Sequence, residues 1–424
     1  MTKSNKTRIA ILGAGITGIT TAWALRRRGF DVTLIDKNGY AAMETSFANG
    51  GQLSASNAEV WNHPSTIVKG IKWMFDRNAP LLVNPKPSWH KYSWMAEFIA
   101  AIPQYTDNTI KTTRLAIAAR EHLLEFARET GAEFDLEKRG ILHIYRNKKA
   151  YDHATKVTQM LAEGGLERRS VSALEMQAIE PALNGPLYAG YYTESDMTGD
   201  IHKFCTGVAA ACQREDVEML FDTTASDFKT MPNGVDILLT HDGAAQRRHF
   251  DAVVVCAGIH SRGIAKALGD RVNVYPVKGY SITVNMPDER SQKAAPWVSL
   301  LDDETKLVTS RLGKDRFRVA GTAEYNGYNR DIRADRIDPL IKWVRQLFPG
   351  VSTEHAVPWA GLRPMLPNMM PKVGAGKRPG VFYNTGHGHL GWTLSGATAE
   401  IIAEQVDAAL TSGHRHGHDF SKAA

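Results

Sequence analysis

Residues 8–36 read RIAILGAGITGITTAWALRRRGFDVTLID, and this stretch decides the fold of the N-terminal part of the chain. A short apolar run precedes Gly13, Gly15 and Gly18, and apolar residues then recur at helical spacing up to Gly29. A second apolar run ends at Asp36. The order of strand, glycine-rich turn, helix and strand predicts a βαβ unit that binds a dinucleotide.

Each glycine of this GxGxxG motif has a mechanical reason. Gly13 permits the tight turn, Gly15 lets the backbone approach a pyrophosphate, and Gly18 lets the helix pack on the sheet. The first helical residues, Ile16 and Thr17, then offer backbone N–H groups to the negative charge. The acid that ends the second strand is placed to accept hydrogen bonds from an adenosine ribose.

Composition narrows the class of protein. Of the 424 residues, 43% are apolar and 23% charged, which is typical of a globular protein and excludes a disordered or fibrous one. The 51 Lys and Arg residues exceed the 45 Asp and Glu residues by six, and no basic run is longer than Arg26–Arg28. Nucleic-acid-binding proteins concentrate their basic residues, so we expect no nucleic-acid partner.

The cysteines and the apolar segments bear on location. Cys205, Cys212 and Cys256 are too few for a disulfide framework and favour a reducing compartment. The uncharged stretch after Arg8 imitates a signal peptide, but three glycines interrupt it. No segment approaches the roughly 20 apolar residues of a membrane-spanning helix. We therefore expect a soluble or peripheral protein.

Two later segments favour a flavin over a nicotinamide cofactor. The apolar run 252–256, followed by Ala257 and Gly258, is typical of a buried parallel strand that returns to the same sheet. Residues 384–393, NTGHGHLGWT, repeat the order of strand end, glycine-rich turn and helix start. A second helix N-terminus suits the pyrimidine edge of a flavin, where negative charge accumulates on reduction.

Six blocks stand in order along the chain: Gly13–Gly18, Glu44–Gln52, Ile71–Phe75, Tyr275–Ser281, Gly361–Met365 and Asn384–Thr393. Together they resemble bacterial D-amino acid dehydrogenase of the small-subunit type, within the D-amino acid oxidase and glycine oxidase superfamily. The similarity extends from the first strand to about residue 410. Because six separate blocks match, the resemblance is more specific than any one motif.

The resemblance implies non-covalent FAD and oxidative deamination of D-amino acids to 2-oxo acids and ammonia. It implies that electrons pass to a quinone or another respiratory acceptor. It also implies an α/β Rossmann-like FAD-binding domain assembled from discontinuous segments, with a mixed α+β substrate-binding domain. We expect the FAD-binding domain at 1–56, 196–274 and 360–411, the substrate-binding domain at 57–195 and 275–359, and a disordered tail at 412–424.

Motif and resemblance together predict the residues that contact FAD. Ala225 is expected to touch adenine through its backbone, and the segment from Thr45 is expected to pass close to the flavin. The expected set is Gly13, Gly15, Ile16, Thr17, Gly18, Asp36, Lys37, Thr45, Ser46, Asn49, Gly50, Gly51, Gln52, Ala225, Ala257, Gly258, Gly361, Arg363, Gly388, His389, Leu390, Gly391, Trp392 and Thr393. We expect no metal site.

Three residues are candidates for substrate binding or catalysis. Arg363 is the first, because a guanidinium matches a carboxylate in two parallel hydrogen bonds; a structural ion pair is the alternative. Tyr280 is expected to place its hydroxyl near the substrate carboxylate, and His387 lies in the loop expected to meet the flavin. Either residue could instead belong to the core. Glu324 and Tyr325 are weaker candidates for the pocket lining.

Departures from the family pattern leave the substrate's side chain open. Residues 367–371, PNMMP, replace the expected Asp-Gly, and Tyr325 stands where an apolar residue is expected. Cyclic or N-methylated amino acids, such as D-proline, hydroxy-D-proline or sarcosine, are the alternative substrates. A non-catalytic flavin-binding protein is the alternative from another class.

Two segments bear on partners and location. Residues 72–75, KWMF, combine aromatic and basic residues and suit a lipid interface, although core packing is the commoner outcome. Together with the few cysteines, the sequence favours a cytoplasmic protein. Peripheral contact with the inner membrane through this segment is one interpretation. His414, His416 and His418 are expected in a solvated tail. The sequence does not determine the oligomeric state.

Overall fold

The computed structural model describes residues 7–66 and 80–416, with side chains described to residue 411. Its first sheet contains the N-terminal βαβ unit, with β1 (Arg8–Leu12) and β2 (Asp31–Ile35) in parallel register. The strand order is β19-β20-β13-β1-β2-β9. The other strands are β9 (Glu218–Leu220), β13 (Ala252–Val255), β19 (Lys372–Ala375) and β20 (Val381–Thr385).

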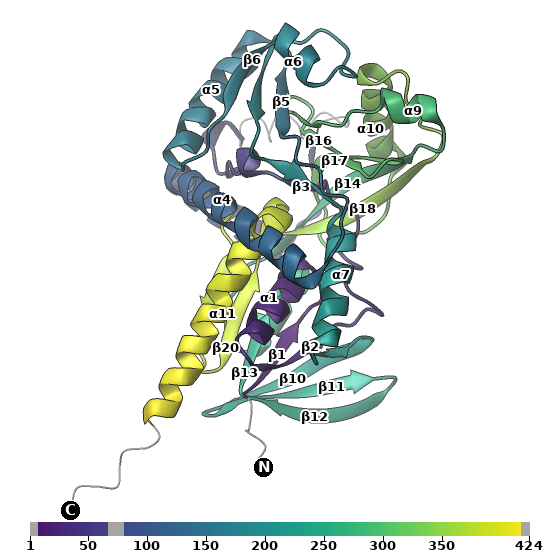
Figure 1. Cartoon of the computed structure of the whole chain (residues 1–424). Helices are drawn as coiled ribbons and strands as arrows, with labels where there is room; N and C mark the ends of the chain where they lie inside the picture. Colours follow the sequence, from purple (N-terminus) through teal and green to yellow (C-terminus); the bar gives the residue numbers. More distant parts are fainter. Residues whose placement is uncertain (1–6, 67–79, 417–424) are drawn as a thin grey trace, which may run out of the picture.

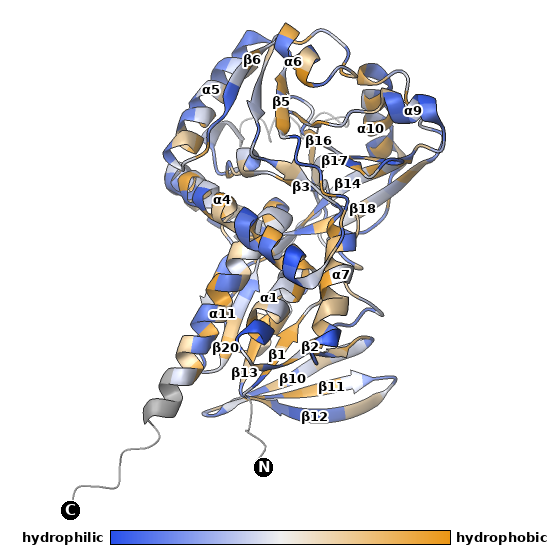
Figure 2. Cartoon of the chain, viewed as in Figure 1, coloured by the Kyte–Doolittle hydropathy of each residue, from blue (hydrophilic) through white to orange (hydrophobic). Residues whose placement is uncertain are grey.

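Helices cover one face of this sheet and a small antiparallel sheet covers the other (Figure 1). The helices are α1 (Ile16–Arg27), α4 (Tyr105–Thr130), α7 (Ile201–Arg214) and α11 (Gly391–His416); the small sheet contains β10 (Thr223–Met231), β11 (Gly234–His241) and β12 (Ala244–Phe250). Between the helices and the sheet, Ile11, Trp23 and Phe204 belong to one buried cluster. This packing explains why β1 and β13 are almost wholly apolar (Figure 2).

A second, larger sheet lies above the first in Figure 1. Its order is β18-β14-β17-β16-β15-β5-β7-β6, and β4 pairs with β17. The strands are β4 (Leu81–Val83), β5 (Ile141–Tyr145), β6 (Arg169–Ser172), β7 (Ala189–Thr193), β14 (Tyr275–Asn285), β15 (Ser299–Asp302), β16 (Leu307–Leu312), β17 (Arg316–Tyr325) and β18 (Ala356–Met365). Both parallel and antiparallel pairs occur, as a mixed sheet requires.

The remaining elements surround the two large sheets. The helices are α3 (Trp89–Ala100), α5 (Lys148–Glu163), α6 (Ala173–Ile179), α8 (Ser261–Ala267), α9 (Glu289–Ala294) and α10 (Ala334–Leu347). Two short strands, β3 (Gln52–Leu53) and β8 (Met197–Thr198), pair with each other. Trp343 of α10 packs in one buried cluster with Tyr280 of β14, so this helix covers one face of the larger sheet.

The predicted fold class is confirmed: a Rossmann-like α/β part is joined to a mixed part. In particular, β13 lies between β1 and β20 with parallel pairing on both sides. Parallel strands in one sheet end at the same edge, so the two glycine-rich turns that follow β1 and β20 are brought together. This convergence is what the sequence predicted from the two motifs.

Several boundaries differ from the predictions. Strand β18 runs across the boundary expected at residue 360 and pairs with β14 along its length, so it belongs to the larger sheet. Helix α11 continues to His416 instead of ending near residue 410. The sequence reasoning also missed α5 and the hairpins of β10–β12. The 72–75 segment lies outside the described residues.

Within the described part of the chain, no helix is both long enough and apolar enough to cross a bilayer.

Candidate active site

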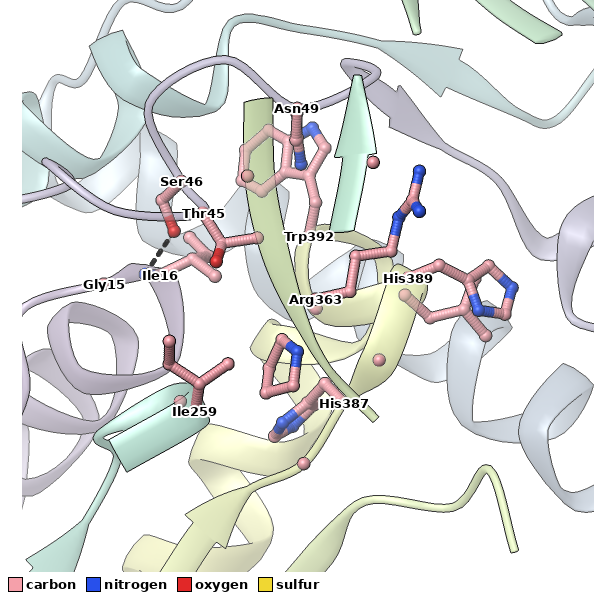
Figure 3. Close-up of a pocket in the computed structure, with 18 of the residues that line it drawn as sticks. Gly15, Ile16, Thr45, Ser46, Asn49, Ile259, Arg363, His387, His389 and Trp392 are labelled. Atoms are coloured by element: carbon pink, nitrogen blue, oxygen red, sulfur yellow. Dashed lines mark hydrogen bonds between the residues drawn. The ribbon is translucent and has the colours of Figure 1, made fainter. Parts of the chain in front are cut away.

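One cavity of about 820 Å³ joins the two parts of the fold. Its walls include the turn after β1, the segment 44–52, strand β18 and the turn after β20. Figure 3 shows side chains from these four segments gathered around the same space. The volume lies within the usual range of ligand sites and leaves room for a large cofactor together with a small substrate.

The turn after β1 has the geometry that its glycines were expected to permit. Gly13 has a φ of 108° and donates its N–H to the Ile35 carbonyl at 2.8 Å. A Cβ at Gly18 would lie 1.7 Å from the Gly13 carbonyl oxygen, so only glycine fits there. Gly18 does not line the cavity; it brings the helix close to the turn, which is the packing role predicted for it.

The N-terminus of α1 is open toward the cavity. Its N-cap, Gly15, has no side chain to bond the first N–H groups. The Ile16 N–H donates to Ser46 Oγ at 3.0 Å (Figure 3), and the Ala14 N–H donates to Asp36 Oδ2 at 2.6 Å. Asp36 therefore holds the glycine turn, and its carboxylate lines the cavity where a ribose was expected.

The segment 44–52 connects this turn to the larger sheet. Thr45 Oγ1 donates to the Leu362 carbonyl of β18 at 2.8 Å. Ser281 Oγ of β14 donates to the Ala48 carbonyl at 2.9 Å. These hydrogen bonds fasten the segment across the junction of the two sheets and place it along the cavity wall.

Nearly all of the predicted contact residues line this one cavity. They are Gly13, Gly15, Ile16, Thr17, Asp36, Lys37, Thr45, Ser46, Asn49, Gly50, Gly51, Gln52, Ala225, Ala257, Gly258, Gly361, Arg363, Gly388, His389, Leu390, Gly391, Trp392 and Thr393. The residues come from distant parts of the sequence, so the fold brings together what the motifs indicated separately. Their contacts with a ligand stay predictions.

Arg363 lies on β18 with its guanidinium in the cavity wall. It donates to the Thr322 carbonyl at 2.7 Å and more weakly to the Gly321 carbonyl at 3.4 Å. No carboxylate among the described residues pairs with it, and burial lowers the pKa of its guanidinium to about 10. A structural ion pair, the alternative function of this residue, is therefore absent from the described part of the chain.

Tyr280 lies on the opposite face of the larger sheet from Arg363. Arg363 is paired with Val277, so its side chain shares the face of Val277 and Gly279, whereas Tyr280 points the other way. The Tyr280 hydroxyl donates to Glu324 Oε2 at 2.8 Å inside the core. The structure does not bring this hydroxyl to the Arg363 guanidinium. Tyr280 is nonetheless among the residues that line the cavity, so a contact of its hydroxyl with a substrate carboxylate stays a prediction.

The two weaker candidates, Glu324 and Tyr325, are neighbours on β17 and point to opposite faces of the larger sheet. Glu324 joins the buried cluster of Tyr280 and Lys278, whose Nζ lies 3.5 Å from the carboxylate. Tyr325 packs with Trp94 and Tyr275. Burial raises the pKa of the Tyr325 phenol, while the nearby charge of Arg363 opposes that rise. Neither residue is among those that line the cavity.

The two histidines of the terminal turn are neutral. Burial lowers the pKa of His387 to about 3, and its Nε2 lies 3.0 Å from Thr398 Oγ1 of α11. Burial and the charge of Arg363 lower the pKa of His389 to about 4. The His389 ring stacks on Trp61 with 4.8 Å between ring centroids. His387 thus anchors the turn to its own helix, and neither imidazole is suited to carry a proton at neutral pH.

Other cavity residues were missed by the sequence reasoning. His143 of β5 hydrogen-bonds Ser56, and Arg168 and Tyr145 lie in the same part of the wall. Burial and the charges of Arg168 and Lys306 hold the pKa of His143 well below its usual range. These residues are isolated in the sequence and belong to no motif, so only the folding of the larger sheet brings them to the cavity.

Comparison with known proteins identifies the family. The sequence profile described as DAO, FAD dependent oxidoreductase, matches residues 8–405. The chain belongs to this family. FAD is therefore its cofactor, and the family resemblance inferred from the six blocks is confirmed.

Two relatives match over almost their whole length. The chain is 60% identical to "D-amino acid dehydrogenase 3" of Mesorhizobium japonicum over 399 residues, which are 94% of this chain and 97% of the relative. It is 39% identical to "D-amino acid dehydrogenase" of Paramagnetospirillum magneticum, with 94% of each chain covered.

Solved structures show the same fold at low sequence identity. Glycine oxidase from Geobacillus kaustophilus has a TM-score of 0.72 at 19% identity, with 95% of each chain covered. L-proline dehydrogenase from P. horikoshii has a TM-score of 0.73 at 15% identity, with 96% of this chain and 94% of that one covered. Since one is named for glycine and the other for L-proline, the fold leaves the substrate open.

The residues present fit FAD. The open helix N-terminus, where Gly15 lines the cavity without a side chain, suits the pyrophosphate. Gln52 Oε1 and Trp392 Nε1 are buried, lie on cavity residues and have no hydrogen-bond partner within the described ranges. A flavin ring has both donors and acceptors along its polar edge and would satisfy such atoms. Trp392 lies in the first turn of α11, whose N-terminus lines the same cavity as the segment 44–52.

Acid should destabilise the protein through His387. Its pKa is about 3 in the folded state and about 6.5 when unfolded, so below pH 6.5 the unfolded state binds the proton first. Stability then falls as pH falls, by about 1.4 kcal/mol per pH unit. We expect His387→Gln to lose less thermal stability than the unmodified protein between pH 7 and pH 5, measured by calorimetry.

The control is His241→Gln, because the side chain of His241 is 58% exposed. This variant should retain the pH dependence of the unmodified protein. An unchanged pH dependence in His387→Gln would show that the buried imidazole is not the group responsible.

Proposed function

We propose that this protein oxidises D-amino acids to 2-oxo acids and ammonia with FAD as the hydride acceptor. The observation that carries the proposal is Arg363, a partly buried cation in the cavity wall whose hydrogen bonds, among the described residues, go to two backbone carbonyls. Such a charge is costly unless a ligand supplies an anion. An amino acid carboxylate is that anion, and the names of the two relatives support the D series.

The mechanism rests mostly on orientation. The guanidinium holds the substrate carboxylate in two parallel hydrogen bonds, which limits rotation of the amino acid in the cavity. Bound FAD supplies the redox chemistry by accepting the hydride from Cα. The substrate amine is neutral at that moment, so its lone pair assists departure of the hydride. Water then hydrolyses the imino acid to the 2-oxo acid and ammonia.

The chain contributes little acid–base chemistry to this reaction. His387 and His389 are neutral over the physiological range, because burial lowers both pKa values far below 6.5. The Tyr280 hydroxyl is occupied by Glu324 on the other face of the sheet. We infer that the substrate loses its ammonium proton to solvent before hydride transfer, and that the pH dependence of flavin reduction follows the pKa of the substrate amine.

Anaerobic flavin bleaching tests the proposed function. The oxidised protein is mixed with single D- and L-amino acids without oxygen, and absorbance near 450 nm is followed. We expect D-amino acids to bleach the flavin and their L enantiomers to leave it oxidised. Bleaching by sarcosine or L-proline alone would show that the substrates are N-methylated or cyclic amino acids instead of D-amino acids. Unchanged absorbance with every compound would favour a non-catalytic flavoprotein.

Arg363→Leu should raise KM for a D-amino acid by about 100-fold or more, because a charge-assisted bidentate contact is lost. Bound flavin should stay in place. The measurement is steady-state kinetics with a dye acceptor, together with the flavin content of the purified variant. A KM within about threefold of the unmodified enzyme would contradict the assignment.

Arg311→Lys is the matched control. Arg311 is a buried arginine of β16 that also donates to backbone carbonyls, including that of Ala295. It does not line the cavity. We expect its replacement to reduce stability and to leave KM unchanged, which separates loss of a ligand contact from general damage to the sheet.

We infer that the reduced flavin passes its electrons to a quinone or a similar respiratory acceptor. An aromatic run supports this proposal: Trp359 lines the cavity, and its ring lies 6.5 Å from Phe47, which is 40% exposed. Phe47 meets His202 at 5.0 Å between ring centroids, and His202 meets exposed Tyr40 at 5.9 Å. This run offers a planar apolar acceptor a surface next to the flavin site.

The proposed acceptor also bears on location. A quinone resides in the bilayer, so we infer a cytoplasmic protein that contacts the inner membrane peripherally. The three buried thiols fit a reducing compartment.

Phe47→Ser should slow reoxidation of the reduced flavin by a short-chain 1,4-benzoquinone about tenfold, because the acceptor loses an aromatic contact beside Trp359 of the cavity wall. Flavin reduction by substrate and reoxidation by ferricyanide should remain near the unmodified rates, as stopped-flow absorbance can show. Trp89→Ser is the control, since Trp89 is 82% exposed on α3 and is not part of the aromatic run of Phe47 and Trp359. Equal effects of the two substitutions would contradict the proposed surface.

A further inference from the structure

Strand β17, which is separated from β18 by β14, contains a bulge where the Arg363 side chain reaches it. Lys278 of β14 pairs with Glu324, and Tyr280 pairs with Gly321, so two steps along β14 face three steps along β17. The extra residue lies within the segment 321–324. Bulges often lie next to active sites, where they change the direction of a side chain, and they are functional features of a fold rather than defects.

The bulge turns two successive carbonyls toward one guanidinium. In a regular strand, neighbouring carbonyls point in opposite directions, but here the oxygens of Gly321 and Thr322 both accept from Arg363. They hold Nη1 and Nη2 and leave the other N–H groups of the fork for a carboxylate. The bulge thus orients the arginine.

Gly279 completes this cradle from the neighbouring strand. A Cβ at Gly279 would lie 2.4 Å from Nη2 and 2.5 Å from Cζ of Arg363. Only a residue without a side chain leaves room for the guanidinium to lie against β14. The position of Arg363 therefore depends on the backbone of both adjoining strands.

Thr322 is strained in this arrangement. Its φ is 59°, in the left-handed region, and it is the one β-branched residue with a positive φ among the described residues. A β-branched residue is rarely found there, because its Cβ substituents collide with the backbone. Such strain persists where surrounding contacts enforce it, and it gathers at functional sites.

The Thr322 hydroxyl supplies a second observation. Its Oγ1 is buried and has no hydrogen-bond partner among the described residues, although Thr322 lines the cavity. A buried hydroxyl without a partner is unfavourable. The same residue holds Nη1 of Arg363 through its carbonyl, so a carboxylate bound to the arginine would lie near the hydroxyl.

We propose that Thr322 is a substrate-binding residue: its strained backbone positions Arg363, and its hydroxyl donates a hydrogen bond to the substrate carboxylate. The inference rests on the proposed function, because it assigns the ligand of Arg363 as a carboxylate. The Thr322 hydroxyl would add a neutral hydrogen-bond donor to the charged guanidinium of Arg363. This role explains why a β-branched residue with a hydroxyl occupies a backbone conformation suited to glycine. The ligand class is a monocarboxylate.

The test measures carboxylate affinity without turnover. Propionate is titrated into the oxidised holoenzyme, and the perturbation of the flavin absorbance spectrum gives Kd. Thr322→Ser retains the hydroxyl and should bind propionate within about threefold of the unmodified protein. Thr322→Val retains the shape without the hydroxyl and should bind about tenfold more weakly, as expected for one lost hydrogen bond.

Two further variants test the positioning role. Thr322→Gly removes both the strain and the hydroxyl, so its Tm should rise while its propionate affinity falls about tenfold. Gly279→Ala should displace the guanidinium and weaken binding by about 100-fold while FAD stays bound. A rise in stability with a loss of affinity is a signature that a merely structural residue would not produce.

The outcomes decide the inference. Equal Kd values for the valine and serine variants would overturn the role of the hydroxyl, and a lower Tm for Thr322→Gly would overturn the role of the strain. If propionate does not bind the unmodified holoenzyme, the carboxylate assignment of Arg363 fails as well. If D-amino acids bleach the flavin but no Thr322 substitution changes the Kd of propionate, the proposed function stands and only the role of Thr322 is rejected.

Discussion

The site depends on a positive charge in the cavity wall that, within residues 7–66 and 80–411, is held by backbone carbonyls and by no carboxylate. Arg363 donates to two carbonyls of β17 and lies against the bare backbone of Gly279. Desolvation of such a cation is expensive, and the low pKa of this guanidinium reflects that cost. An anionic ligand would supply the missing partner, and we propose that the cavity favours a carboxylate at this point.

The cavity exists because the two large sheets meet along the segment 44–52. This segment bonds the first helix through Ser46 and the larger sheet through Thr45. The glycine turn therefore keeps a fixed relation to Arg363, although they lie more than 300 residues apart in the sequence. These few hydrogen bonds connect the glycine turn of the first sheet to the strand that carries Arg363.

The sequence predicted the cofactor part well because its signals are local. Gly13, Gly15 and Gly18 act through the backbone of a single turn, and the apolar runs of β1 and β13 require burial in a parallel sheet. Arg363 was also found, since a conspicuous motif surrounds it. For Tyr280 the motif predicts a strand correctly, but the face to which a strand residue points depends on pairing and burial, and here the hydroxyl meets Glu324.

The sequence by itself determined the dinucleotide-binding unit, its cofactor class and the arginine that would hold an acid. Only the tertiary structure decided that Tyr280 and Glu324 belong to the core, that His387 and His389 are neutral, and that the bulge at Thr322 cradles Arg363. The physical reason is that a glycine turn follows from local backbone geometry. Burial of a charged group, the register of paired strands and the hydrogen bonds between a guanidinium and distant carbonyls depend on how distant segments pack together.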